Sequence, residues 1–160
     1  MLPTDSKPPQ GWRLALRVAG MVWTLPNTLL GVVLGAIGML WGARGRISRH
    51  EFALVFDRWP WGPGGAMTLG NVIINTLDGL DAECLSYAHR AGECVDPKMR
   101  LGDHERAHVY QYMLLGPLFL PLYFLLGGVS ARNPLERAAD RYAIEGRGWW
   151  PWGGATRRPA

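Results

Sequence analysis

The chain has 160 residues, which suffices for one domain with a modest hydrophobic core. Its net charge is +4, but no run of basic residues is interleaved with base-stacking aromatic residues. This pattern argues against nucleic-acid binding and favours contact with anionic lipid headgroups. No charged side chain stands between Arg17 and Arg44, or between Arg106 and Arg132. Because about 20 apolar residues cross a bilayer, these two blocks predict a membrane protein.

The first 43 residues predict a flexible N-terminus, 1–17, followed by a transmembrane helix, 18–43. The apolar block is longer than the h-region of a signal peptide, so we expect a retained anchor. Pro26 and Asn27 predict a kink close to its start. Tryptophans stand near both ends of the block, as is typical of membrane interfaces; they are Trp12, Trp23 and Trp41.

Glycines recur at helical spacing within this anchor, at i, i+4, i+7 and i+11. They are Gly31, Gly35, Gly38 and Gly42. Such a face allows another helix to approach closely in lipid. It therefore predicts a packing surface, either for a membrane protein partner or for the second apolar block. The alternative is that glycine is simply frequent in membrane helices.

The segment after the anchor predicts a β-hairpin. Hydrophobic alternation favours a strand within 47–61, and a second strand follows at 67–75. The glycines and prolines of 60–65 supply the turn between them. We expect one hairpin, whose edge strand could align a peptide by strand addition.

Residues 76–103 are polar and predict a loop, with a short helix near 82–90. Cys84 and Cys94 lie in this loop. They could form a disulfide in an oxidising compartment or remain free thiols in the cytosol. The sequence leaves both alternatives open.

The strongest chemical motif is HERAH, residues 104–108. On a helix, His104 and His108 project from one face, so both rings can reach one metal ion. Glu105 would lie beside them and could act on a metal-bound water. Asp103 is a reasonable N-cap for this helix. The alternative is a polar helix start with incidental histidines, and the other histidines, His50 and His89, are expected at the surface.

The second apolar block, 112–129, is interrupted by Gly116-Pro117 and by Pro121. One straight helix would carry the chain about 22 Å away from the histidines. We therefore expect a hairpin that dips into the membrane, or a helix packed on the glycines of the anchor. A new helix then begins with Asn133 as N-cap and Pro134 at its first position.

Catalytic zinc needs a third protein ligand and an open position for water. Glu136, 28 residues after His108, opens the last predicted helix and is the leading candidate. Asp140 follows one helical turn later. From there it could accept the N–H of a ligating imidazole and fix the orientation of the ring.

Together, HERAH and NPLERAADRYA resemble the gluzincin group of metallopeptidases, in which HExxH is followed by ExxxD on a second helix. In a membrane-anchored chain, this pair of motifs is most similar to the CaaX prenyl protease group. The wider string HExxHxxQY…GPLF…P…NPxExxA also resembles small bacterial membrane proteins of uncharacterised activity. The resemblance covers roughly residues 66–145.

The resemblance implies that Zn2+ binds His104, His108 and Glu136, with Glu105 as general base and Asp140 in contact with a ligating histidine. It implies a zinc metallopeptidase anchored in the bacterial inner membrane, which hydrolyses peptide bonds with a zinc-bound water activated by Glu105. Two features depart from the family pattern. Asp103 and Arg106 are charged residues beside the glutamate, and the chain offers little room for a substrate-binding subdomain.

The predicted fold is thus an α+β membrane protein with a transmembrane helix, a β-hairpin, the HExxH helix, a broken apolar hairpin and a C-terminal ligand helix. Residues 44–146 would form a minimal zincin-like domain, and 147–160 a tail rich in tryptophan and arginine. A second hypothesis is a non-catalytic subunit of a larger membrane complex, in which the metal site is structural. The two hypotheses share the metal and differ in Glu105.

Overall fold

Two β-hairpins form the central sheet. In the first, β1 (Arg44–Ser48) pairs antiparallel with β2 (Ala53–Asp57); in the second, β3 (Ala66–Leu69) pairs antiparallel with β4 (Val72–Asn75). The hairpins join through a parallel pairing of β2 with β4, which gives the strand order β1-β2-β4-β3. Among the described residues β3 is therefore an edge strand, and an edge strand can pair with another chain.

This computed structural model describes residues 10–84, 86, 92 and 99–152. Outside the central sheet, the described elements are α1 (Gln10–Trp23), α2 (Leu25–Met39), β5 (Glu83–Cys84), β6 (Met99–Arg100), α4 (Leu101–Leu115), the 3-10 turn η1 (Gly116–Leu118), α5 (Phe119–Leu125) and α6 (Pro134–Glu145). Cys94, His89 and much of the short helix predicted near 82–90 lie outside the described residues.

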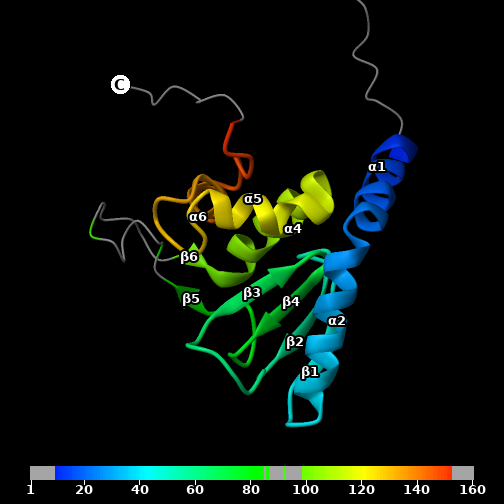
Figure 1. The fold of residues 1–160 in the computed structure, drawn as a ribbon, viewed down its shortest axis with the longest axis vertical. Helices are drawn as coiled ribbons and strands as arrows, with labels where there is room; N and C mark the ends of the chain where they lie inside the picture. Colours follow the sequence, from blue (N-terminus) through cyan, green and yellow to red (C-terminus); the bar gives the residue numbers. More distant parts are fainter. Residues whose placement is uncertain (1–9, 85, 87–91, 93–98, 153–160) are drawn as a thin grey trace, which may run out of the picture.

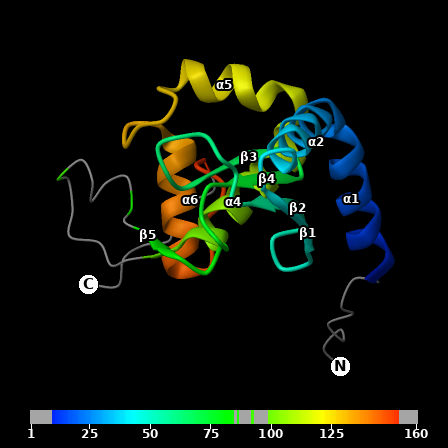
Figure 2. The ribbon, with the colours of Figure 1, turned by 90° about the horizontal axis from the view of Figure 1, so that it is seen from below.

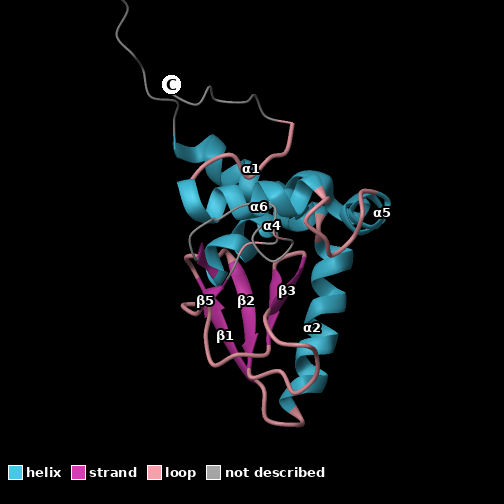
Figure 3. Ribbon diagram, turned by 90° about the vertical axis from the view of Figure 1, so that its left-hand side faces the viewer, coloured by secondary structure: helices cyan, strands magenta, loops and turns pink. Residues whose placement is uncertain are grey.

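Helices cover both faces of the sheet, because its strands alternate side chains between two hydrophobic clusters (Figure 1). On one face, Phe56, Val72 and Ile74 pack with the inner side of α2. On the other face, Val55 and Ile73 pack with α4. Figure 3 shows α2 running alongside the strands, with α4 and α6 grouped at one end of the sheet.

The single predicted hairpin is wrong, because each of its two segments already contains a turn. Phe52, between β1 and β2, has a φ of 56°. Gly70, between β3 and β4, has a φ of 64° and opens a two-residue connection. Positive φ costs glycine little, and glycine at the first position is typical of tight hairpin turns. The stretch 67–75 therefore folds back on itself rather than forming one strand.

The predicted fold class is wrong as well, because the molecule is a small mixed α+β domain without the expected transmembrane helix. Within the described part of the chain, no single helix is long and apolar enough to span a membrane. Leu14–Trp23 and Leu25–Met39 meet the criteria of length and composition only as a pair, and they are bent by 68°. Pro26 lies at the start of α2, where its missing N–H and its ring prevent α1 from continuing as one helix.

The glycine face of α2 contacts the sheet of the same chain. A Cβ on Gly31 would lie 2.7 Å from Cβ of Val72, and one on Gly38 would lie 2.2 Å from Cδ1 of Trp59. The sequence predicted a helix as the partner of this face; the sheet takes that place. Gly42 does not belong to the face, because it lies in the turn after α2 with a φ of 102°.

Gly35 makes the tightest of these contacts and supports a stability prediction. A Cβ there would lie 2.1 Å from Cδ2 of Phe56, a buried ring that has little room to move. We expect Gly35→Ala to lower the free energy of unfolding by about 1–3 kcal/mol, the usual range for overpacking. Gly11→Ala is the control, because a Cβ on Gly11 meets nothing within 4 Å. Equal urea midpoints for the two variants would contradict the assigned contact.

Candidate metal centre

Helix α4 carries the HERAH motif, and its N-terminus is fixed by the segment that leads into β5. The backbone N–H groups of Leu101 and Gly102 donate to the carbonyls of Ala82 and Leu80 at 3.0 and 2.9 Å. The helix therefore begins at Leu101, three residues earlier than a cap at Asp103 would allow. That N-cap prediction is wrong, and Asp103 lies in the first turn.

Helix α6 brings the acidic residues to α4. The side chain of Asn133 accepts a hydrogen bond from the N–H of Leu135 at 3.0 Å, and Pro134 is the first helical residue, as the sequence predicted. Alanines at the helix contact, Ala107 and Ala139, are fully buried. Because these side chains are small, the two helices approach closely enough for their polar residues to meet.

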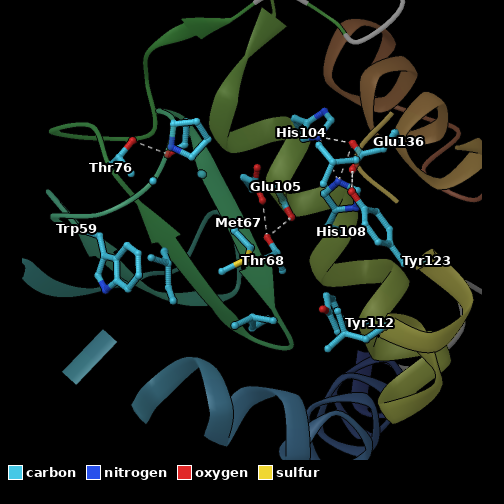
Figure 4. Close-up of a pocket in the computed structure, with 18 of the residues that line it drawn as sticks. Trp59, Met67, Thr68, Thr76, His104, Glu105, His108, Tyr112, Tyr123 and Glu136 are labelled. Carbon is cyan, nitrogen blue, oxygen red and sulfur yellow. Dashed lines mark hydrogen bonds and ion pairs between the residues drawn. The ribbon is translucent and has the colours of Figure 1, made fainter. Parts of the chain in front are cut away.

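Three buried side chains converge between α4 and α6 (Figure 4). Nε2 of His104 lies 3.1 Å from Nε2 of His108 and 3.1 Å from Oε2 of Glu136. Nε2 of His108 lies 3.3 Å from the same carboxylate oxygen. Tetrahedral zinc with bonds of about 2.0–2.1 Å separates its ligand atoms by about 3.3–3.4 Å. The triangle formed by these three atoms is therefore of the size that a zinc ion requires.

Each histidine is oriented through its other ring nitrogen. Nδ1 of His104 lies 3.0 Å from Oδ1 of Asp140. Nδ1 of His108 lies 2.9 Å from Oε1 of Gln111, whose amide nitrogen donates to the carbonyl of Leu135 and so fixes which end faces the ring. Both Nδ1 atoms thus have an acceptor for a proton. In the neutral rings the Nε2 lone pairs then point to the common centre, which is the arrangement a metal ligand needs.

Tyr123 of α5 orients the third candidate ligand. Its hydroxyl donates a hydrogen bond to Oε1 of Glu136, which leaves Oε2 facing the two histidines. The ring of Tyr123 also packs edge-on against that of His108. The second apolar block of the sequence therefore contributes a polar group to the site.

The electrostatics of the cluster favour a positive charge at its centre. Burial lowers the pKa of His104, but the hydrogen bond to Asp140 and the charge of Glu136 outweigh burial and raise it well above the ordinary value. Burial raises the pKa of Glu136, but the charge of His108 and a hydrogen bond from His104 outweigh burial and hold it well below the usual range. A proton or a metal ion can satisfy these lone pairs. The two compete, so metal binding would release protons.

Glu105 lies beside the cluster, at the wall of a cavity of about 360 Å³. Its carboxylate is buried, and Oε2 accepts a hydrogen bond from Oγ1 of Thr68 at 2.6 Å. The cavity lies between edge strand β3 on one side and α4 and α5 on the other, and it also contacts His104, His108 and Glu136. In Figure 4, Glu105 lies between strand β3 and the two histidines. The candidate ligands and a candidate base therefore share one cavity.

Spacing alone did not reveal several residues of the site. Gln111 stands three positions after His108, so a search along the helix could have found it. Thr68 and Tyr123 come from distant elements, and no local signal marks them. Tyr112 also lines the cavity; burial raises its pKa, and its hydroxyl has no hydrogen-bond partner among the described residues.

Asp103 and Arg106, the charged residues that flank the motif's glutamate in the sequence, do not line this cavity. A guanidinium nitrogen of Arg106 lies 3.1 Å from the carboxylate of Asp103, and a second one lies 2.9 Å from Nε2 of His50. Arg100 contacts Asp103 as well and donates to the buried carboxylate of Glu51 at 2.8 Å. This network connects the start of α4 to the turn between β1 and β2. His50 is exposed, as predicted.

Glu51 makes the stability of this connection pH-dependent. Burial raises its pKa, but hydrogen bonds from Ser48, His50 and Arg100 outweigh burial and lower it to about 2. A depressed carboxyl pKa stabilises the fold above the unfolded value near 4.5, and that contribution is lost as the pH falls toward 2. We expect a loss of about 3 kcal/mol over this range, measurable by urea unfolding at several pH values. In Glu51→Gln the same pH dependence should be clearly shallower; an unchanged slope would contradict the assignment.

Comparison of the chain with protein-family models, with curated proteins and with solved structures gives no match.

Proposed function

We propose that the protein is a zinc-dependent hydrolase that cleaves peptide bonds. The observation that carries the proposal is the convergence of three buried ligand atoms in one cavity with the carboxylate of a fourth residue, Glu105. Two histidines and a glutamate form a known ligand set of catalytic zinc. The same set leaves one coordination position for water or substrate.

In this proposal, His104, His108 and Glu136 hold the zinc ion. When bound, zinc lowers the pKa of water toward neutrality and polarises a carbonyl group. Glu105 is the general base, because its carboxylate faces the cavity without belonging to the ligand triangle. Thr68 holds that carboxylate through its hydroxyl, and Asp140 and Gln111 keep the Nε2 atoms of the histidines directed at the centre.

The edge strand β3 supports a peptide as the substrate. Leu69 and Val72 flank the two-residue turn of the second hairpin and so form its first hydrogen-bonded pair. Because bonded and non-bonded pairs alternate along antiparallel strands, the backbone groups of Thr68 and Ala66 point to the free edge. Both residues line the cavity. An extended peptide could pair with this edge and place a carbonyl beside Glu105.

One observation favours a second candidate function, a non-catalytic protein with a structural metal site. The candidate ligands already contact one another as ion pairs, and Tyr123, Asp140 and Gln111 complete a closed set of contacts. Such an arrangement can be stable without turnover. In that case the protein would serve as a subunit of a larger membrane complex.

Metal removal tests the proposal. We expect the purified protein to contain about one zinc ion per chain and to hydrolyse an unstructured protein such as casein. A chelator should abolish hydrolysis, and added zinc should restore it. Absence of zinc from protein purified and reloaded at neutral pH would contradict the metal site. Bound zinc without hydrolysis of any peptide in a random library would favour the structural role.

A further inference from the structure

The outer side of α2 is an exposed apolar surface. The side chains that point away from the sheet are hydrophobic along the whole helix, among them Leu25, Leu29, Leu30, Val33 and Ile37. Leu29 is 59% exposed. The inner side of the same helix is covered by the sheet. Because the inner side contacts the sheet, only the outer side of α2 is available to a partner outside the chain.

Helix α5 continues this surface. Phe124 is 67% exposed and Leu125 is 84% exposed. Leu120 of α5 packs in the same hydrophobic cluster as Val32 and Leu34 of α2, so the two helices are neighbours. Figures 2 and 3 both show α2 and α5 on one side of the sheet. We call the exposed hydrophobic side chains of α2 and α5 the apolar face.

The cavity of the candidate metal centre borders this face. Phe124 belongs to both, since it lines the cavity and is exposed. Trp61 and Val129 are also exposed cavity residues. The ring of Trp61 lies 5.2 Å from that of Trp41, which follows the end of α2. The rim of the cavity is therefore apolar and joins α5 to the end of α2.

The charges around the apolar face fit an anionic lipid surface. Residues 10–43 contain no acidic residue, and residues 107–131 contain no charged residue. Exposed arginines stand directly after these segments, at Arg44 and Arg132. A surface with apolar side chains in its middle, arginines at its borders and tryptophans near them is typical of proteins that lie in the membrane interface.

We propose that the apolar face binds the surface of an anionic lipid bilayer, with the mouth of the cavity directed at the lipid. The protein then lies on the membrane without α2 crossing it. The substrate class rests on the proposed peptidase function: the substrates would be apolar peptide segments that reach β3 from the bilayer. Contiguous exposed apolar patches of this kind are rare on proteins without such a partner.

Vesicle binding tests the docking surface independently of hydrolysis. We expect the full chain to cosediment with vesicles of phosphatidylcholine and phosphatidylglycerol, and to bind at least tenfold more weakly to vesicles of phosphatidylcholine alone. The double variant Leu29→Glu, Leu125→Glu should bind at least tenfold more weakly than the unmodified protein. Ile144→Glu is the control, because Ile144 is an exposed hydrophobic residue of α6 and does not belong to the apolar face of α2 and α5. Equal binding of the double variant and the control would overturn the proposal.

A fluorophore shows whether the cavity rim faces the lipid. In a background of Cys84→Ser and Cys94→Ser, Phe124→Cys is labelled with an environment-sensitive dye, and Ile144→Cys serves as control. We expect vesicles to shift the emission of the first label to shorter wavelength, and nitroxide lipids to quench it, with little effect on the second. The reverse pattern would overturn the proposed orientation. The label at position 124 could instead be shielded from water in the absence of lipid. If the protein also forms dimers, that result would overturn the proposal and show that a second copy of the chain covers the apolar face.

Discussion

Replacement of Glu136 by glutamine is expected to weaken zinc binding by more than 100-fold while the fold is retained. The change preserves size but removes the negative charge and the Oε2 atom that lies 3.1 and 3.3 Å from the two histidine Nε2 atoms. Loss of a residue that only orients a ligand already costs about 10–100-fold in metal affinity. Asp140→Asn should fall in that smaller range. Competition with a chromogenic zinc chelator at neutral pH measures both affinities.

Arg137 supplies the control for this series. It is exposed on the same helix, one residue after Glu136, so Arg137→Gln removes one charge without reaching the site. We expect its zinc affinity to match that of the unmodified protein. An equal loss in Arg137→Gln would point to a general disturbance of the helix. Full affinity in Glu136→Gln would exclude Glu136 as a ligand.

The part of the site that depends on helix periodicity could be predicted from the sequence. His104 and His108 share a face because they stand four residues apart on a helix, and Glu136 and Asp140 do so for the same reason. The capping signal of Asn133 placed the second helix correctly. These are local rules, and they hold because each helix is regular over the few residues concerned.

Contacts between distant elements could not be predicted in this way. Thr68 meets Glu105 only because β3 is the edge strand, and that strand order follows from a parallel pairing between two hairpins. Tyr123 lies in the apolar block that predicts a hairpin dipping into the membrane or a helix packed on the anchor, yet its hydroxyl donates a hydrogen bond to Glu136. Apolar composition does not distinguish a side chain that faces lipid from one that faces a protein core.

The same ambiguity explains the error about the N-terminal helix. Gly31 and Gly35 indicated a close contact, and the structure contains one, but with Val72 and Phe56 of a sheet. Glycines on one face of a helix allow any neighbouring element to approach closely, whether that element is a helix or a sheet. The break before Pro26 separates α1 from α2, because proline lacks the backbone N–H and its ring hinders a continuous helix.

Replacement of Glu105 by glutamine separates the two functional hypotheses most sharply. The amide keeps the shape of the side chain and can still accept a hydrogen bond from Thr68 through its oxygen, but it cannot take a proton from water. General-base catalysis contributes about 10²–10⁴-fold. We therefore expect peptide hydrolysis to fall by that factor, with zinc content unchanged, because Glu105 lies outside the ligand triangle.

Thr68→Val gives this experiment a graded comparison. It keeps the shape of the side chain while removing the hydroxyl that holds Oε2 of Glu105 at 2.6 Å. A hydrogen bond to a charged group contributes about 1.5–3 kcal/mol, so the decrease in hydrolysis should be smaller than in Glu105→Gln. If Glu105→Gln cleaves peptides at the unmodified rate, the carboxylate of Glu105 is not the general base. A loss of zinc along with activity would instead assign Glu105 to the ligand set.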